Sequence, residues 1–72
     1  MKVYSYKELR EKSVDDLLDL LSSFNKEKKE TYLLIKSDPC NEKFYIENHL
    51  YFQELNIRKV KNELILRTEL KH

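Results

Sequence analysis

The sequence predicts an all-α fold, an antiparallel two-helix hairpin of the coiled-coil type preceded by a short N-terminal helical turn. Apolar side chains recur at steps of three and four residues through both halves of the chain, which is the spacing of one helix face. The dipeptide Asp38-Pro39 separates the halves, and a residue before proline is disfavoured in the α region. With only 72 residues, we expect a single domain over 1–72.

Residues 1–12 are expected to hold the N-terminal turn. Ser5 is followed three residues later by Glu8, which is the spacing of a capping box. The first long helix is expected over 13–36, with Ser13 as its N-cap and Asp16 three residues on. Its predicted inner stripe, apolar at five of seven positions, is Val14, Leu17, Leu21, Phe24, Lys28, Thr31 and Ile35.

A loop is expected over 37–42 and the second long helix over 43–71, with Asn41 or Asn48 as its cap. Its predicted inner stripe consists of Ile46, Leu50, Gln53, Ile57, Val60, Leu64, Arg67 and Lys71. One alternative stays open, because residues 31–36 and 43–47 are also β-prone runs that flank a turn-like segment. That alternative is an α-β-β-α domain.

Composition argues against several classes of function. The chain has no glycine, so loops that cradle phosphates through glycine are excluded. Cys40 is the only cysteine, which excludes an intramolecular disulfide and a cysteine zinc cluster and suits a reducing compartment. Cys40 and His49 lack a third group that would orient a nucleophile–base pair. We therefore expect no enzyme activity, metal, cofactor or small-molecule substrate. The sequence shows no signal-peptide pattern and no long apolar run, so we expect neither secretion nor membrane insertion.

Charge is distributed unevenly along a chain whose net charge is only +1. Residues 37–55 hold one lysine against four acidic residues, a net charge of −3, whereas 56–72 hold five basic residues against two acidic ones, a net charge of +3. Salt screens charges over about 8 Å at physiological ionic strength. The basic segment, which includes Arg58, Lys59 and Lys61, is therefore able to contact phosphate on a nearly neutral chain.

The second helix also carries apolar residues on the side opposed to its inner stripe, namely Phe52, Leu55, Leu66 and Leu70. Two interpretations remain open. The side is covered by residues of the N-terminal turn, from among Val3, Tyr4, Tyr6 and Leu9, or it docks against a partner protein or against the sugar faces of a nucleic acid.

Three short segments resemble, in order and approximate spacing, one family of ribosomal proteins. Glu8-Leu9-Arg10 followed by Ser13-Val14-Asp15-Asp16-Leu17 resembles the N-terminal signature of the twenty-ninth large-subunit ribosomal protein family. Lys28-Lys29-Glu30 with Tyr32 is similar to a segment late in that family's first helix, and Ile57-Arg58-Lys59-Val60-Lys61 to the basic stretch of its second helix.

The resemblance implies a non-catalytic structural constituent of the large ribosomal subunit, a two-helix hairpin beside the peptide exit tunnel. Its implied partners are large-subunit rRNA and adjacent ribosomal proteins, including the twenty-third-family protein. The chain is less basic than members usually are, and its composition favours amino acids with AT-rich codons, which together suit a divergent organellar ribosome. A mitochondrial location is expected, with a plastid or a bacterial-type cytoplasm as alternatives. The positions implied to contact RNA are Lys7, Arg10, Lys29, Arg58, Lys59 and Lys61.

The rival interpretation is a small helical-hairpin adaptor that mediates protein–protein contact without RNA. The near-neutral net charge favours the adaptor, whereas the ordered match of three segments favours the ribosomal protein.

Overall fold

The computed structural model describes residues 2–70, except for the side chain of Leu70. The prediction of an all-helical fold is confirmed, since no strand occurs in that part of the chain. The α-β-β-α alternative is therefore wrong. In chain order the elements are α1 (Tyr6–Arg10), α2 (Val14–Ser37), the 3-10 turn η1 (Pro39–Asn41), α3 (Glu42–Tyr45), the π-helical segment η2 (Ile46–Leu50) and α4 (Tyr51–Leu70).

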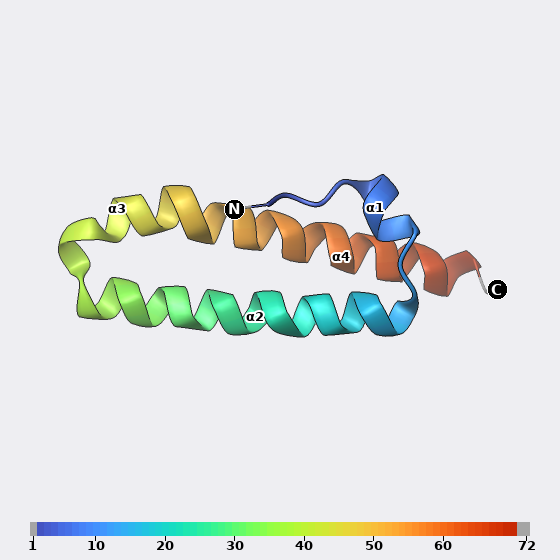
Figure 1. Cartoon of the computed structure of the whole chain (residues 1–72), viewed down its shortest axis with the longest axis horizontal. Helices are drawn as coiled ribbons and strands as arrows, with labels where there is room; N and C mark the ends of the chain where they lie inside the picture. Colours follow the sequence, from blue (N-terminus) through green and yellow to red (C-terminus); the bar gives the residue numbers. More distant parts are fainter. Residues whose placement is uncertain (1, 71–72) are drawn as a thin grey trace.

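Two helical arms make up most of the molecule. One arm is α2, and the other consists of α3, η2 and α4, which follow one another almost without a break. Figure 1 shows the arms side by side and running in opposite directions, with η1 at the turn between them. The molecule is accordingly a rod, with extents of 48 × 17 × 16 Å. Residues 2–10, here called the N-terminal segment, lie along α4 (Figure 1).

Local capping explains where the first two helices begin. The Ser5 hydroxyl accepts the amide of Glu8 at 3.2 Å while the Glu8 carboxylate reaches back to the Ser5 amide, which is a complete capping box. Ser13 accepts the amide of Asp16 at 3.1 Å, as the sequence predicted. The far end of α2 lies at Ser37, beside the Asp38-Pro39 step that was expected to end it.

The second arm differs from the uninterrupted helix expected over 43–71. It begins at Glu42 and contains the π-helical segment η2, which no feature of the sequence predicted. Asn41 stands at the N-cap position of α3, but its side chain makes no capping bond and its amide donates to the Asp38 carboxylate at 2.8 Å. Asn48 lies inside η2 and is not a cap; its amide donates to the Phe44 carbonyl at 3.0 Å. The expected end of this helix at residue 71 lies outside the described residues.

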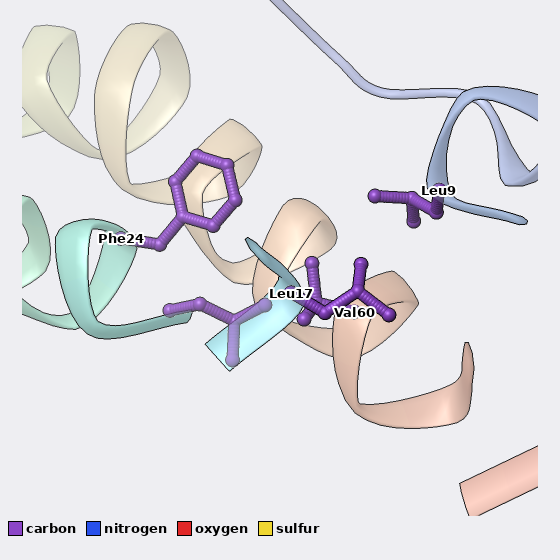
Figure 2. Close-up of a cluster of buried hydrophobic side chains, with 5 residues drawn as sticks. Leu9, Leu17, Phe24 and Val60 are labelled. Atoms are coloured by element: carbon purple, nitrogen blue, oxygen red, sulfur yellow. The ribbon is translucent and has the colours of Figure 1, made fainter. Parts of the chain in front are cut away.

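A small core holds the arms and the N-terminal segment together. Figure 2 shows Leu17 of α2 against Val60 of α4, with Phe24 to one side and Leu9 of α1 approaching from the other. Ile57 completes the buried set, and partly buried side chains packed around it are Tyr4, Leu20, Leu21 and Leu64. The predicted stripes therefore provide most of the core, but their outer members Val14 and Ile46 are exposed.

A buried polar contact joins the arms beyond this core. The Gln53 amide donates to the Thr31 hydroxyl at 2.9 Å, and the same hydroxyl donates to the Glu27 carbonyl. Both side chains are buried. A buried polar group without a partner is costly, so this bond favours the alignment of α2 and α4 in which the two residues meet.

We expect Leu17→Ala to lower the free energy of unfolding by about 2–5 kcal/mol, because it removes a fully buried side chain from the five buried apolar residues of the described chain. Urea denaturation followed by circular dichroism measures the change. Leu33→Ala, at an exposed position of the same helix, is the control and should stay within about 0.5 kcal/mol of the parent. Equal effects of the two substitutions would contradict the assigned core.

Titration should report the ion pair at the start of the chain. The Lys2 ammonium lies 2.8 Å from the Glu8 carboxylate, and this contact, with the hydrogen bond from Ser5, holds the pKa of Glu8 below its ordinary value of 4.5. A lowered pKa stabilises the fold above the unfolded-state value, and that contribution is lost as the pH falls through the folded-state value. In an NMR titration, Lys2→Met should raise the pKa of Glu8, whereas Lys12→Met should not. An unchanged Glu8 pKa in the Lys2 variant would rule out the pairing.

Candidate nucleic-acid interface

The N-terminal segment occupies one flank of α4, here called the covered flank. The Asn56 side chain is fully buried there; its carbonyl oxygen accepts the Tyr4 amide at 3.0 Å and its amide donates to the Lys2 carbonyl at 2.9 Å. The Lys59 ammonium donates to the Tyr4 carbonyl at 3.0 Å and lies 5.5 Å from the centre of the Tyr6 ring. The segment is thus bound largely through its main chain.

Arg67 fastens the other end of the N-terminal segment. Its guanidinium donates to the carbonyls of Leu9 and Arg10, at the end of α1, at 2.9 and 3.0 Å. The Leu9 carbonyl also accepts the Lys12 amide at 3.2 Å. The buried Glu63 carboxylate accepts from the same guanidinium at 3.3 Å. Arg67 was predicted as part of an inner stripe and counted among the basic residues of 56–72, so this role was missed.

The apolar residues predicted as a protein interface divide between the two interpretations left open above. Phe52 and Leu55 are half-buried, whereas Leu66 is exposed. The side chain of Leu70 lies outside the described part of the chain. Leu66 borders a shallow hollow together with Tyr6, Arg10, Asn62 and Ile65. The N-terminal segment therefore covers this side incompletely.

Arg58 and Lys61 lie on the opposite flank of α4, here called the open flank. Arg58 follows Asn56 by two residues and Lys61 follows Lys59 by two, which is about half a helical turn in each case. Asn56 and Lys59 face the N-terminal segment, so the other pair faces away from it. Both are exposed, and within the described residues no acidic oxygen lies within 4.0 Å of either cation.

Lys29 of α2 lies next to a contact that joins the arms. The Lys28 ammonium pairs with the Glu54 carboxylate at 3.5 Å and so joins the two arms. Glu54 precedes Arg58 by one helical turn on α4, so this ion pair lies on the open flank. Lys29 is the next residue along α2 and is exposed. Of the six residues expected to contact RNA, Arg58 and Lys61 therefore share the open flank, and Lys29 is exposed on the neighbouring arm.

The other three predicted RNA-contacting residues lie elsewhere. Lys7 and Arg10 are exposed on α1, where the Arg10 guanidinium is 3.9 Å from the Glu63 carboxylate. Lys59 already holds the N-terminal segment and is half-buried. Lys59, which was predicted to contact RNA, therefore binds the N-terminal segment instead. The sequence could not show this, because Lys59 and Tyr4 are 55 residues apart.

Two searches of the described residues bear on other kinds of site. Over residues 2–70 there is no group of three or more His, Cys, Asp or Glu side chains that could hold a metal ion. Within the same range, none of the helices has the length and apolar character needed to cross a membrane. Cys40 is exposed at the turn between the arms.

We expect Asn56→Ala to loosen the N-terminal segment, because it leaves the Tyr4 amide and the Lys2 carbonyl without their partner. The cost in the free energy of unfolding should be about 1–3 kcal/mol. Hydrogen exchange at the Tyr4 amide should quicken as well. Asn62→Ala, which removes a longer and exposed bond of 3.3 Å to the Tyr6 hydroxyl, is the control and should have a smaller effect. Unchanged exchange at Tyr4 would contradict the role given to Asn56.

Comparisons with protein-family models, with curated protein sequences and with solved structures found no match to this chain. A function is therefore inferred from the residues themselves, namely the ordered segments of the sequence and the two unlike flanks of α4.

Proposed function

We propose that this protein is a structural constituent of a large ribosomal subunit. In this role it catalyses no reaction and acts as a rigid scaffold between rRNA and neighbouring proteins. In this proposal the two arms form the antiparallel, coiled-coil-like hairpin that the family resemblance implies. Its place is beside the peptide exit tunnel, next to the twenty-third-family protein, in a ribosome that is mitochondrial or, alternatively, of plastid or bacterial type.

The open flank is the observation that carries the proposal. Arg58 and Lys61 are exposed on α4, on the side that the N-terminal segment leaves free. Cations held at fixed spacing on a rigid element suit phosphate groups, and such contacts position a protein on RNA without reading its sequence. These two residues also belong to the segment 57–61 that resembles the family's basic stretch.

The covered flank supports the same proposal in a different way. Because the N-terminal segment is fastened at Asn56, Lys59 and Arg67, α4 is held on two sides, by α2 and by this segment. A helix fixed in this way keeps the cations of its third side in constant positions. This rigidity reduces the entropy lost when the cations bind phosphate.

We expect Arg58→Glu/Lys61→Glu to weaken incorporation into large subunits, because two attractions to phosphate become two repulsions while the buried neighbours Ile57 and Val60 remain. Co-sedimentation of the tagged chain with large subunits in sucrose gradients measures incorporation. Binding to deproteinised large-subunit rRNA, measured over a range of salt concentrations, should show a log–log slope reduced by about two.

The matched control is Lys26→Glu/Lys43→Glu, which changes the net charge equally at exposed positions away from Arg58 and Lys61. Circular dichroism establishes that both variants keep the helical content of the parent. The control should incorporate like the parent. If the Arg58/Lys61 variant folds and incorporates like the parent too, or if the parent stays at the top of the gradient, the proposed function is wrong.

A further inference from the structure

The N-terminal segment and α4 together form a shallow hollow, here called the tyrosine hollow. Its lining consists of Tyr6, Arg10, Asn62, Ile65 and Leu66. Figure 1 shows α1 beside α4, which brings Tyr6 and Arg10 to this place. Tyr6 and Asn62, which meet there, are 56 residues apart in sequence.

The α4 side of the tyrosine hollow continues the open flank. Asn62 follows Arg58 by four residues and Ile65 follows Lys61 by four, so each pair lies one helical turn apart on the same face. The exposed cations of Arg58 and Lys61 therefore lie directly beside the hollow. A ligand whose anionic group binds these cations reaches the hollow with the part next to that group.

The hollow itself is positive. Among the described residues, its lining contains no acidic side chain, and it contains the guanidinium of Arg10, whose side chain is 67% exposed. The Arg10 Nε lies 3.9 Å from the Glu63 carboxylate, but that carboxylate is buried and also accepts a hydrogen bond from Arg67. Glu63 and Glu69 border a neighbouring hollow instead. The charge around the tyrosine hollow thus complements an anionic ligand.

The lining combines a fixed aromatic ring with an amide and apolar side chains. The Tyr6 ring is held by the Lys59 ammonium, 5.5 Å from its centre, and by the Asn62 amide, which donates to its hydroxyl at 3.3 Å. The Asn62 carbonyl oxygen accepts no hydrogen bond within residues 2–70. Ile65 and Leu66 expose apolar surface beside these groups. Tyrosine rings and guanidinium planes stack on unpaired bases, and an amide oxygen accepts from the N–H groups of a base edge.

We propose that the tyrosine hollow binds an unpaired base of an RNA strand whose phosphates are held by Arg58 and Lys61. The base lies on the apolar part of the lining beside the Tyr6 ring, and its polar edge donates to the Asn62 carbonyl oxygen. This inference rests on the proposed function, because it extends the phosphate contacts of the open flank. It adds a preference for single-stranded RNA, since the bases of a duplex are paired and stacked on one another.

The chemistry of the hollow distinguishes a base from other occupants. A lipid acyl chain or a leucine side chain would cover the Asn62 carbonyl oxygen without offering it a hydrogen bond, which is costly. A basic peptide is repelled by Arg10, Arg58 and Lys61. A nucleotide brings a negative charge, a flat ring and N–H donors together.

The test compares RNA strands of equal charge with and without bases. Fluorescence anisotropy measures binding of the full chain to a labelled oligouridylate and to an abasic oligomer with the same number of phosphates. The oligouridylate should bind about tenfold more tightly, because stacking of a base is the main difference between the two. The duplex of oligouridylate with oligoadenylate should show no such gain. In NMR spectra, the methyl signals of Ile65 and Leu66 should shift upfield with oligouridylate, as expected next to an aromatic ring, but not with the abasic oligomer.

Tyr6→Leu locates the base, because it keeps an apolar side chain and removes the ring. It should abolish the preference for oligouridylate and leave binding of the abasic oligomer unchanged. Tyr32→Leu, at an exposed tyrosine of α2 that does not line the hollow, is the matched control and should keep the preference. Unchanged hydrogen exchange at the Tyr4 amide, which Asn56 accepts, establishes that the N-terminal segment stays in place.

Several results overturn the proposal. These are equal binding of the two oligomers, methyl signals that do not move, and equal effects of the two tyrosine substitutions. Displacement of the oligouridylate by a leucine–glutamate helical peptide, with the same methyl signals shifted, overturns it in favour of an acidic partner protein, and binding to phosphatidylglycerol vesicles that depends on Tyr6 does so in favour of a membrane. A dimer mass in sedimentation equilibrium without RNA, lost in Tyr6→Leu, overturns it in favour of a second copy.

This inference and the proposed function fail separately. Arg58→Glu/Lys61→Glu should weaken binding of both oligomers, whereas Tyr6→Leu should weaken binding of the oligouridylate alone. Equal binding of both oligomers that still depends on Arg58 and Lys61 refutes the base site and leaves the phosphate contacts standing. A parent chain that prefers oligouridylate but stays at the top of the gradient refutes the ribosomal role and leaves the base site standing.

Discussion

The rest of the structure depends on the two hydrogen bonds that the Asn56 side chain makes to the main chain of the N-terminal segment. Two helices lying side by side bury only one narrow stripe each, and a chain of this size has little core to spare. Asn56 makes a third layer possible, because its amide matches both the donor and the acceptor of an extended main chain. Tyr4 is thereby placed edge-on to Phe24, with ring centres 5.8 Å apart, and Leu9 reaches complete burial.

This third layer makes the two flanks of α4 unlike each other. On the covered flank, polar and charged side chains are used to bind main-chain groups at sequence separations above fifty residues. On the open flank, side chains of the same types have no such task. Arg58 and Lys59 are neighbours in sequence, but one is exposed to solvent and the other is bound to Tyr4. The number of basic residues in a segment is therefore a poor measure of the positive charge it offers to a ligand.

Local features of the sequence were predicted well, whereas long-range polar contacts were not. The caps at Ser5 and Ser13 and the end of α2 beside Asp38-Pro39 depend on a few adjacent residues, so the residue types alone indicate them. The buried positions of Leu17, Phe24, Ile57 and Val60 follow from helical periodicity.

Asn56 and Glu63 were missed because a polar residue is ordinarily expected at the surface, and only the partners Lys2, Tyr4 and Arg67 explain their burial. For the candidate site, the sequence placed Arg58, Lys59 and Lys61 in one basic segment but could not show that Lys59 is occupied. Nothing in the sequence identified the carbonyl of Tyr4 as the partner of Lys59.

The π-helical segment at Ile46–Leu50 changes the phase of the second arm. Its hydrogen bonds close over five residues rather than four, so the turn holds one residue more than an α-helical turn. One residue corresponds to a rotation of about 100° in an α-helix. Side chains before the segment are turned by that angle relative to the stripe that Gln53, Ile57 and Val60 continue, and Ile46, which an unbroken helix would direct inward, is exposed. Tyr45 is instead aimed at the Asp38 carboxylate, 3.3 Å from its hydroxyl. The extra residue thus takes the tip of the rod out of the helical repeat that aligns Gln53, Ile57 and Val60 with α2.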